Sequence, residues 1–134
     1  MKPLTALVLA GTRSGGDPMA AVAGVGHKAL IEIHGRSMIE RVVAALAQSP
    51  SVERIIIAID APDLLSEHPE LRAAAGDKAL TLMSTGEGPS ATVAAALRGE
   101  GTPMLVTTAD HALLQAQWID EFLAACPADA DAVV

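Results

Sequence analysis

The strongest constraint on the fold comes from short apolar runs that contain almost no polar residues. Leu4–Ala10 is such a run, bounded by Pro3 and Gly11. Arg54–Asp60 contains a second apolar run, the five residues IIIAI. Half-exposed strands alternate apolar and polar residues, whereas strands buried on both faces, as in a parallel sheet, are continuously apolar. We therefore expect these runs, together with Pro103–Thr108, to form strands of a parallel sheet.

Stretches with helical character separate the apolar runs. Ser37-Met38-Ile39-Glu40 has the form of a capping box and predicts a helix over residues 38–48, which Ser49-Pro50 would end. Strands and helices that alternate at this spacing indicate a single α/β domain over residues 1–134, with a mostly parallel sheet flanked by helices. Further helices are expected between Pro62 and about Ala75, from Ser90 as cap to Gly99, and over Gln115–Ala125, and shorter strands over Ala29–Ile33, Ala79–Met83 and, as the opening of another strand, Asp131–Val134.

Composition narrows the class of protein. Hydrophobic residues make up 51% of the 134 residues but aromatic residues only 1%, so the core must be aliphatic. A net charge of −7 argues against a nucleic-acid partner, and no apolar run reaches the length of a membrane span. The single Cys126, which we assign to helix packing, excludes an internal disulfide and suits a reducing compartment. We expect a cytoplasmic protein without a membrane partner.

Charge is distributed unevenly along the chain. Arg13, Lys28, Arg36 and Arg41 crowd into the first third, and no Lys or Arg follows Arg98. Two interpretations stay open: a local anion site with a separate acidic site for a cation, or an ordinary acidic surface. The acidic residues that follow Arg98 include Asp110, Asp120, Glu121, Asp129 and Asp131.

Three segments with unusual composition come directly after expected strands. They are Gly11–Arg13, Thr85–Ser90 and Asp110. Because right-handed crossovers bring the carboxyl ends of parallel strands to one edge, where ligands bind in open α/β sheets, we expect these segments to meet at one crevice. Glycines interspersed with Arg13 and Lys28 suggest that the ligand is an anion, although a plain surface loop is the alternative for the glycine-rich stretch.

Common phosphate-binding motifs do not explain this stretch. Gly26-His27-Lys28-Ala29 is not a P-loop, because a His precedes the Lys and no metal-binding hydroxyl follows it. Gly24–Ala29 has the letters of a dinucleotide fingerprint, but it does not follow the first strand and does not open a clear helix. No His pair has zinc spacing and no G-x-S-x-G is present. We interpret His27 and His111 as loop histidines.

The segments together resemble a known family. Leu9–Arg13, Lys28-Ala29-Leu30 and Gly35–Val42 resemble, in this order, the opening of nucleotidyltransferases. Gly88–Val93 resembles their second nucleotide segment, and Thr107–Asp110 resembles the position of their metal-binding aspartate. The chain is similar over nearly its whole length to the MobA-like NTP transferases, which include molybdenum-cofactor guanylyl- and cytidylyltransferases. The resemblance implies a Rossmann-like, GT-A-like fold that is truncated at its C-terminus.

The resemblance also implies an activity. The protein would transfer NMP from an NTP to a phosphorylated small-molecule acceptor, such as a molybdopterin-type cofactor or a sugar phosphate, and release pyrophosphate. Lys28 would contact the α-phosphate, Arg13 the β- and γ-phosphates, and Asp110 would hold Mg²⁺, which suits a carboxylate together with phosphate oxygens. The nucleotide-binding positions carried over are Leu9, Ala10, Gly11, Thr12, Thr85, Gly88 and Ser90.

The sequence departs from the family pattern at several positions, and two alternative functions therefore stay open. Thr12 stands where glycine is common, Arg13 comes earlier than the usual arginine, and the family's second metal-binding carboxylate falls beyond Val134. These departures favour a nucleotide-binding or regulatory domain with impaired catalysis. A GT-A glycosyltransferase is the other alternative, but that class often carries D-x-D, and Ala109-Asp110-His111 supplies one carboxylate.

Overall fold

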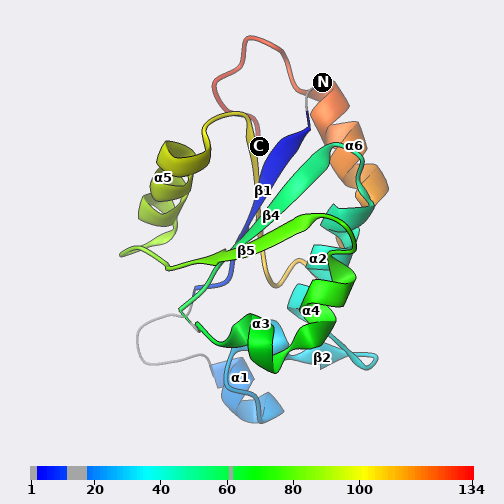
Figure 1. Cartoon of the computed structure of the whole chain (residues 1–134), viewed down its shortest axis with the longest axis vertical. Helices are drawn as coiled ribbons and strands as arrows, with labels where there is room; N and C mark the ends of the chain where they lie inside the picture. The colour runs from blue at the N-terminus through cyan, green and yellow to red at the C-terminus, as the bar shows by residue number, and fades with distance from the viewer. Residues whose placement is uncertain (1–2, 12–17, 61) are drawn as a thin grey trace.

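The centre of the protein is a four-stranded parallel sheet (Figure 1). The computed structural model describes residues 3–11, 18–60 and 62–134. A two-stranded antiparallel pair, β2 (Glu32–Ile33) and β3 (Arg36–Ser37), lies apart from the main sheet. The main strands lie in the order β5 (Ala79–Met83), β4 (Val52–Ala58), β1 (Leu4–Leu9) and β6 (Met104–Thr108).

The four strands end level with one another at their carboxyl ends. Leu9 pairs with Ala58 on one side and with Thr108 on the other, and Ala58 pairs with Met83. From β1 the chain moves outward to β4 and β5, and helix α5 (Pro89–Glu100) then carries it back to β6 on the other side of β1. Open α/β sheets bind ligands where the strand order reverses in this way. In this sheet the reversal lies at the ends of β1 and β6.

Helices cover both faces of the sheet, but unequally. On one face lie α2 (Met38–Gln48), α4 (Pro69–Ala74) and α6 (Ala116–Ala125), whereas α5 alone covers the other (Figure 1). The short elements α1 (Pro18–Ala23), the 3₁₀ helix η1 (Lys28–Leu30) and α3 (Leu64–Glu67) lie toward the carboxyl ends of the strands. None of the described helices combines the length and apolar character needed to cross a membrane.

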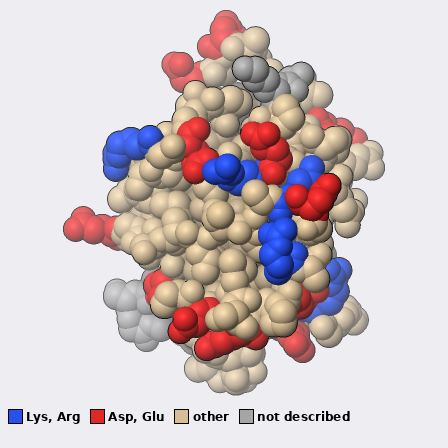
Figure 2. All heavy atoms as spheres, in the orientation of Figure 1, with Lys and Arg blue, Asp and Glu red and all other residues tan. Residues whose placement is uncertain are grey.

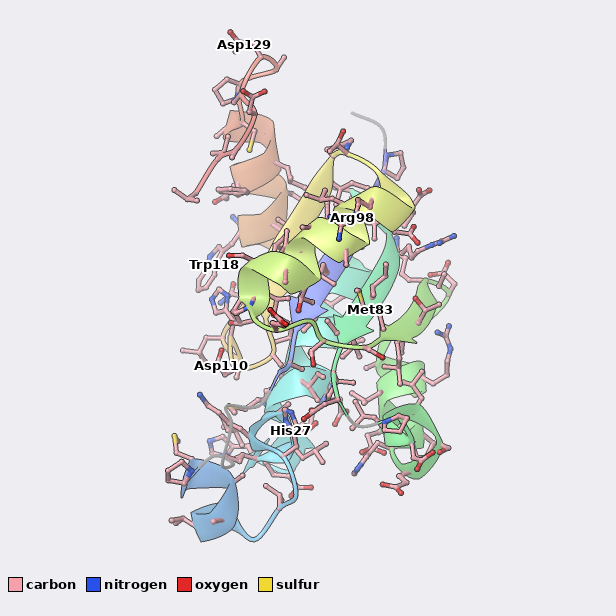
Figure 3. All side chains as sticks on the ribbon, turned by 90° about the vertical axis from the view of Figure 1, so that its left-hand side faces the viewer. His27, Met83, Arg98, Asp110, Trp118 and Asp129 are labelled. Carbon is pink, nitrogen blue, oxygen red and sulfur yellow. The ribbon has the colours of Figure 1, made fainter. Side chains whose placement is uncertain are left out.

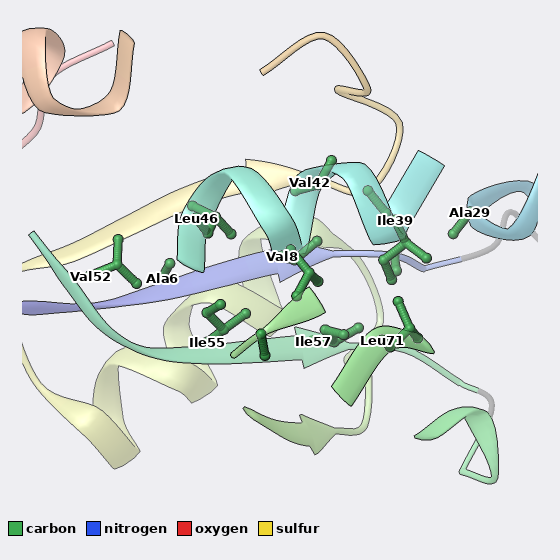
Figure 4. Close-up of a cluster of buried hydrophobic side chains, with 14 of the residues drawn as sticks. Ala6, Val8, Ala29, Ile39, Val42, Leu46, Val52, Ile55, Ile57 and Leu71 are labelled. Atoms are coloured by element: carbon green, nitrogen blue, oxygen red, sulfur yellow. The ribbon is translucent and has the colours of Figure 1, made fainter. Parts of the chain in front are cut away.

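The main core lies between the sheet and α2, and it is aliphatic as composition predicts. Ile39, Val42 and Leu46 of α2 are fully buried against side chains such as Val8 and Ile57 of the central strands (Figure 4). Since successive strand residues point to opposite faces, the remaining side chains form a second, smaller cluster under α5. That cluster consists of Leu7, Ile56, Ala58 and Ala96.

Helix α2 begins with the hydroxyl half of the predicted capping box, whereas the Glu40 side chain pairs with Arg36. The Ser37 hydroxyl accepts a hydrogen bond from the Glu40 amide at 3.2 Å, which satisfies one of the free amides of the first turn. The Glu40 carboxylate forms an ion pair with Arg36, whose Nε donates a hydrogen bond to it at 2.9 Å. The helix ends at Gln48, with Ser49 as the C-terminal cap, as expected.

Several expected elements differ in the structure. Ala29–Ile33 is not one strand, because η1 occupies its first part and only the two residues of β2 are extended. The helix expected after Pro62 is divided in two before Pro69, whose ring removes an amide donor from the first turn of α4. Asp131–Val134 forms no strand, since a strand requires a hydrogen-bonded neighbour and this segment has none among the described residues.

Candidate nucleotide site

An ion pair joins the two residues to which the resemblance gives the main chemical roles. Lys28 Nζ lies 3.0 Å from Asp110 Oδ2, although 82 positions separate the two residues. Lys28 opens η1, and Asp110 lies two residues after the end of β6. The structure therefore brings a cation and a carboxylate together at the carboxyl edge of the sheet, a contact that the sequence analysis did not predict.

Asp110 is held in place by the end of β6. The Thr108 hydroxyl donates to Asp110 Oδ1 at 2.7 Å, and the Ala109 amide donates to the Leu9 carbonyl at 3.0 Å. The hydrogen bond from Thr108, followed by that from Lys28, lowers the pKa of Asp110 below its usual value. The carboxylate is thus ionised at neutral pH and is anchored two residues beyond the last pair of the β1–β6 ladder.

The chemistry of Asp110 fits a single carboxylate contact to Mg²⁺. An ionised carboxylate is a hard oxygen donor, and Mg²⁺ usually takes one or two of these together with phosphate oxygens and water. Over residues 3–11, 18–60 and 62–134, no group of three or more His, Cys, Asp or Glu side chains is arranged to hold a metal ion. Asp110 suits a metal that arrives with a nucleotide rather than one held by a complete protein cage.

The end of β1 approaches the segment after β5, as the crevice prediction requires. A Cβ atom placed on Gly11 would lie 3.4 Å from Thr85 Cγ2, so these two candidate nucleotide-binding residues are neighbours in space. The Ala10 amide donates to the Ala58 carbonyl at 2.9 Å, which extends the β1–β4 ladder by one residue. Leu9, Ala10 and Thr85 therefore lie at one edge of the sheet.

Thr92, to which the sequence analysis gave no individual role, organises the turn after β5. Its hydroxyl accepts from the Gly86 amide at 2.9 Å and donates to the Gly88 carbonyl at 3.0 Å, and the residue is 2% exposed. Gly86 passes close to α5, because a Cβ there would lie 3.1 Å from Ala91 Cβ. Ser90 is not the helix cap that was expected: Gly88 occupies that position, and Ser90 is exposed within the first turn.

His27, which the sequence suggested was an ordinary loop histidine, is buried beneath the Lys28 turn. Its ring is 7% exposed, and its Nδ1 accepts a hydrogen bond from the Ala29 amide at 3.0 Å. Its Nε2 lies 3.7 Å from Asp60 Oδ1. Figure 3 shows His27 and Asp110 toward the same end of the sheet, whereas Asp129 lies at the opposite end. Nothing in the local sequence distinguishes this buried His from an exposed loop histidine.

The other charges expected near the site are engaged elsewhere. The guanidinium of Arg41 donates to the Ile33 carbonyl, and Arg36 and Arg41 line a groove of about 350 Å³ between α2 and residues 112–117. Asp120 accepts from the hydroxyls of Ser49 and Ser51, so it ties α6 to the end of α2. Figure 2 shows acidic and basic side chains intermingled on the face it draws. Thr12 and Arg13 lie outside the described residues.

Comparison with protein families agrees with this geometry. Residues 6–134 match the model of the MobA-like NTP transferase domain. This chain belongs to that family. No curated protein sequence matches it. The MobA-like family is a nucleotidyltransferase family, so the sequence resemblance is confirmed at that level.

Solved structures confirm the Rossmann-like fold. A hypothetical transferase from Thermus thermophilus is 29% identical, with a TM-score of 0.68 over 96% of this chain and 48% of its own. The 4-diphosphocytidyl-2C-methyl-D-erythritol synthase from Anaerococcus prevotii is 16% identical, with a TM-score of 0.68 over 92% of this chain and 50% of its own. A cytidylyltransferase from Leptospira borgpetersenii is 11% identical, with a TM-score of 0.68 over 98% of this chain and 51% of its own. The chain thus spans about half the length of these structures.

Proposed function

We propose that this chain carries the nucleotide site of a Mg²⁺-dependent nucleotidyltransferase, which transfers NMP from an NTP to a phosphorylated small-molecule acceptor. The observation that carries the proposal is the contact of Lys28 Nζ with Asp110 Oδ2, at the point where the strand order reverses. A cation for phosphate and a carboxylate for a metal meet there although they come from opposite ends of the chain.

The reaction proposed is a displacement at the α-phosphorus of the NTP. An oxygen of the acceptor forms a bond to this phosphorus, the bond to the oxygen that bridges the α- and β-phosphates breaks, and pyrophosphate leaves with the electron pair. Such catalysis depends on positioning and on electrostatic stabilisation of the phosphate oxygens. Lys28 would leave Asp110 and neutralise charge on the α-phosphate, and Asp110 would be the carboxylate contact for Mg²⁺, which supplies Lewis-acid stabilisation.

The remaining residues of the site are proposed to hold the nucleotide. The backbone of Leu9, Ala10 and Gly11 lies at the carboxyl end of β1, and Gly11 has no side chain beside Thr85. Arg13 is proposed for the β- and γ-phosphates. Thr12, Thr85, Gly88 and Ser90 complete the proposed nucleotide contacts.

The acceptor is proposed to be a small phosphorylated molecule, of the cofactor or sugar-phosphate type. The net charge of −7 disfavours a nucleic-acid partner, and the composition suits a cytoplasmic location without a membrane partner. A CTP complex is known for a CMP-2-keto-3-deoxy-manno-octonic acid synthetase that is 18% identical, with a TM-score of 0.65 over 92% of this chain and 46% of its own. This likeness concerns the fold, so the base is left to experiment.

A domain that binds nucleotide without turnover is the second candidate. Asp110 is the only carboxylate that the described residues bring to Lys28, and this observation favours the second candidate. Release of pyrophosphate from an NTP in the presence of acceptor would distinguish the enzyme from a binding domain. A glycosyltransferase with D-x-D is less well supported, because Thr108 and Ala112 stand where the second carboxylate would be.

Nucleotide binding can be tested by thermal unfolding with ATP, GTP, CTP and UTP, each with and without Mg²⁺. A ligand at about 100 times its Kd adds roughly 2.7 kcal/mol to the free energy of unfolding, which raises Tm by several degrees in a domain of this size. We expect a Mg²⁺-dependent shift that Lys28→Ala removes. Arg98→Ala is the control, because it removes one exposed positive charge on α5. If none of the four nucleotides changes Tm, the proposed site is wrong.

A further inference from the structure

We propose that His27 is a positioning residue, which fixes the backbone of Lys28 across the end of β1. The inference rests on the proposed role of Lys28. The backbone of His27 is extended, with φ −149° and ψ 140°, and consecutive side chains of an extended segment point to opposite sides. The His27 ring reaches Asp60, which follows β4, while Lys28 reaches Asp110, which follows β6. The dipeptide therefore bridges both neighbours of β1.

The hydrogen bonding of His27 defines its tautomer. Nδ1 accepts from the Ala29 amide at 3.0 Å, so Nδ1 carries no proton. In a neutral ring the proton is then on Nε2. This nitrogen is buried and has no hydrogen-bond partner among the described residues, and it lies 3.7 Å from Asp60 Oδ1. A donor in this position is attracted to the carboxylate, although the distance exceeds that of a hydrogen bond.

In this arrangement the backbone of residues 27–29 is fixed, whereas the side chain of Lys28 can move. The His27 ring is 7% exposed and caps η1, so the backbone at residues 27–29 is anchored from below. The side chain of Lys28 is 33% exposed, and its amine is held by one surface ion pair. Nζ can therefore pass from Asp110 to a phosphate while its backbone stays in place.

Conservative substitutions distinguish the contribution of Nδ1 of His27 from that of Nε2. In His27→Asn the amide oxygen can replace Nδ1 as acceptor for the Ala29 amide, whereas His27→Gln offers a donor near Nε2 but loses the short acceptor. His27→Ala loses both. Since a misplacement of about 1 Å can cost about 10²-fold in rate, we expect His27→Ala to lower kcat by roughly 10- to 100-fold. His27→Asn should recover most of that loss, and His27→Gln should recover less.

A double-mutant cycle with Lys28→Ala distinguishes positioning from a general structural role. If His27 acts through Lys28, His27→Ala should cause little further loss of kcat once Lys28 is already alanine. Losses that multiply would overturn the inference and leave the role of Lys28 standing. If Lys28→Ala alone changes neither turnover nor the nucleotide-dependent Tm, the proposed function fails and the inference fails with it.

Two further results keep the inference falsifiable. If His27→Ala does not fold, the order of His27→Asn above His27→Gln in kcat carries the test, and the reverse order overturns it. Nitrogen-15 NMR of the full chain at neutral pH gives a readout independent of activity. We expect His27 with a bare Nδ1 and a proton on Nε2, and the opposite tautomer would overturn the inference.

Discussion

The two faces of the sheet are built in different ways. Helix α2 covers one face with side chains that are fully buried, among them Ile39, Val42 and Leu46. Helix α5 covers the other face and buries only Thr92 and Ala96. The first face therefore supplies most of the apolar burial, whereas the second face leads into a turn that the Thr92 hydroxyl holds by hydrogen bonds to Gly86 and Gly88. Stability and nucleotide binding should respond to different substitutions.

The sharpest separation is expected at Asp110, where function should be lost without loss of the fold. Asp110→Asn removes the proposed carboxylate contact to Mg²⁺, and a metal contributes several kcal/mol to transition-state stabilisation. We expect Mg²⁺-dependent pyrophosphate release to fall by about 10³-fold or more. The side chain is 45% exposed, so the free energy of unfolding should change by less than about 1 kcal/mol.

The matched control for this prediction is Asp129→Asn. Asp129 lies at the opposite end of the molecule (Figure 3) and is exposed, so pyrophosphate release should stay unchanged. Full activity in Asp110→Asn would move the metal contact to another residue.

Substitutions in the core between α2 and the sheet should have the opposite effect and lower the free energy of unfolding. Leu46→Ala leaves a cavity in the main core, and substitutions of this kind lower the free energy of unfolding by about 2–5 kcal/mol. Val93→Ala, on α5 itself, removes a half-buried side chain and should cost about 1 kcal/mol. Chemical denaturation measures both. Equal losses in the two variants would contradict the difference between the two faces.

Lys28 should also affect activity far more than stability. As a preorganised donor to the α-phosphate, its loss in Lys28→Ala should lower kcat by about 10²–10³-fold. Its ion pair with Asp110 is partly exposed, so unfolding should change little. Steady-state kinetics would check this, with Arg98→Ala as the variant that removes a distant positive charge. A kcat for Lys28→Ala equal to that of the unsubstituted protein would exclude Lys28 from the reaction.

The sequence predicted the parts of this molecule that depend on local patterns. Leu4–Ala10 reads as a doubly buried strand because it lies beneath helices on both faces, and Ser37 caps α2 as its pattern indicates. The alternation of strands and helices predicted that the carboxyl ends of the strands meet at one edge, where Asp110 lies, but it did not predict the order of the strands or the contact of Lys28 with Asp110. The buried strand, the helix cap and the shared edge of the strand ends depend on local hydrophobic periodicity and on the alternation of strands and helices, and both can be read from the sequence.

What the sequence did not predict depends on contacts between distant segments. The apolar residues at Asp131–Val134 have strand-like composition, but composition does not provide a partner strand. His27 is buried because the turn around Lys28 folds back over the end of the sheet, which no local pattern indicates. Ser90 is a better capping residue than Gly88, yet α5 begins at Pro89, because the Thr92 amide donates to the Gly88 carbonyl at 3.0 Å and closes the first helical turn there.

A substitution in the turn before α5 should have a smaller effect, and it should change both stability and nucleotide binding. Thr92→Val keeps the volume of the side chain but removes both hydrogen bonds of the hydroxyl, to Gly86 and Gly88. We expect a loss of about 1–2 kcal/mol in the free energy of unfolding, together with a weaker nucleotide-dependent rise in Tm. Ser90→Ala is the control for stability, because its side chain is exposed and does not cap the helix. A nucleotide shift unaffected by Thr92→Val would remove this turn from the site.

The smallest expected effect concerns the titration of Asp110. The hydrogen bond from Thr108 is the largest single cause of its lowered pKa, so Thr108→Val should raise that pKa toward its usual value. Because the folded-state pKa is depressed, the stabilising contribution of Asp110 is present above its unfolded-state pKa and is lost as the pH falls through the folded-state pKa. In Thr108→Val this loss should begin at a higher pH. Carbon-13 NMR of the carboxyl group measures the titration directly, and an unchanged pKa in Thr108→Val would show that the strand end does not tune this carboxylate.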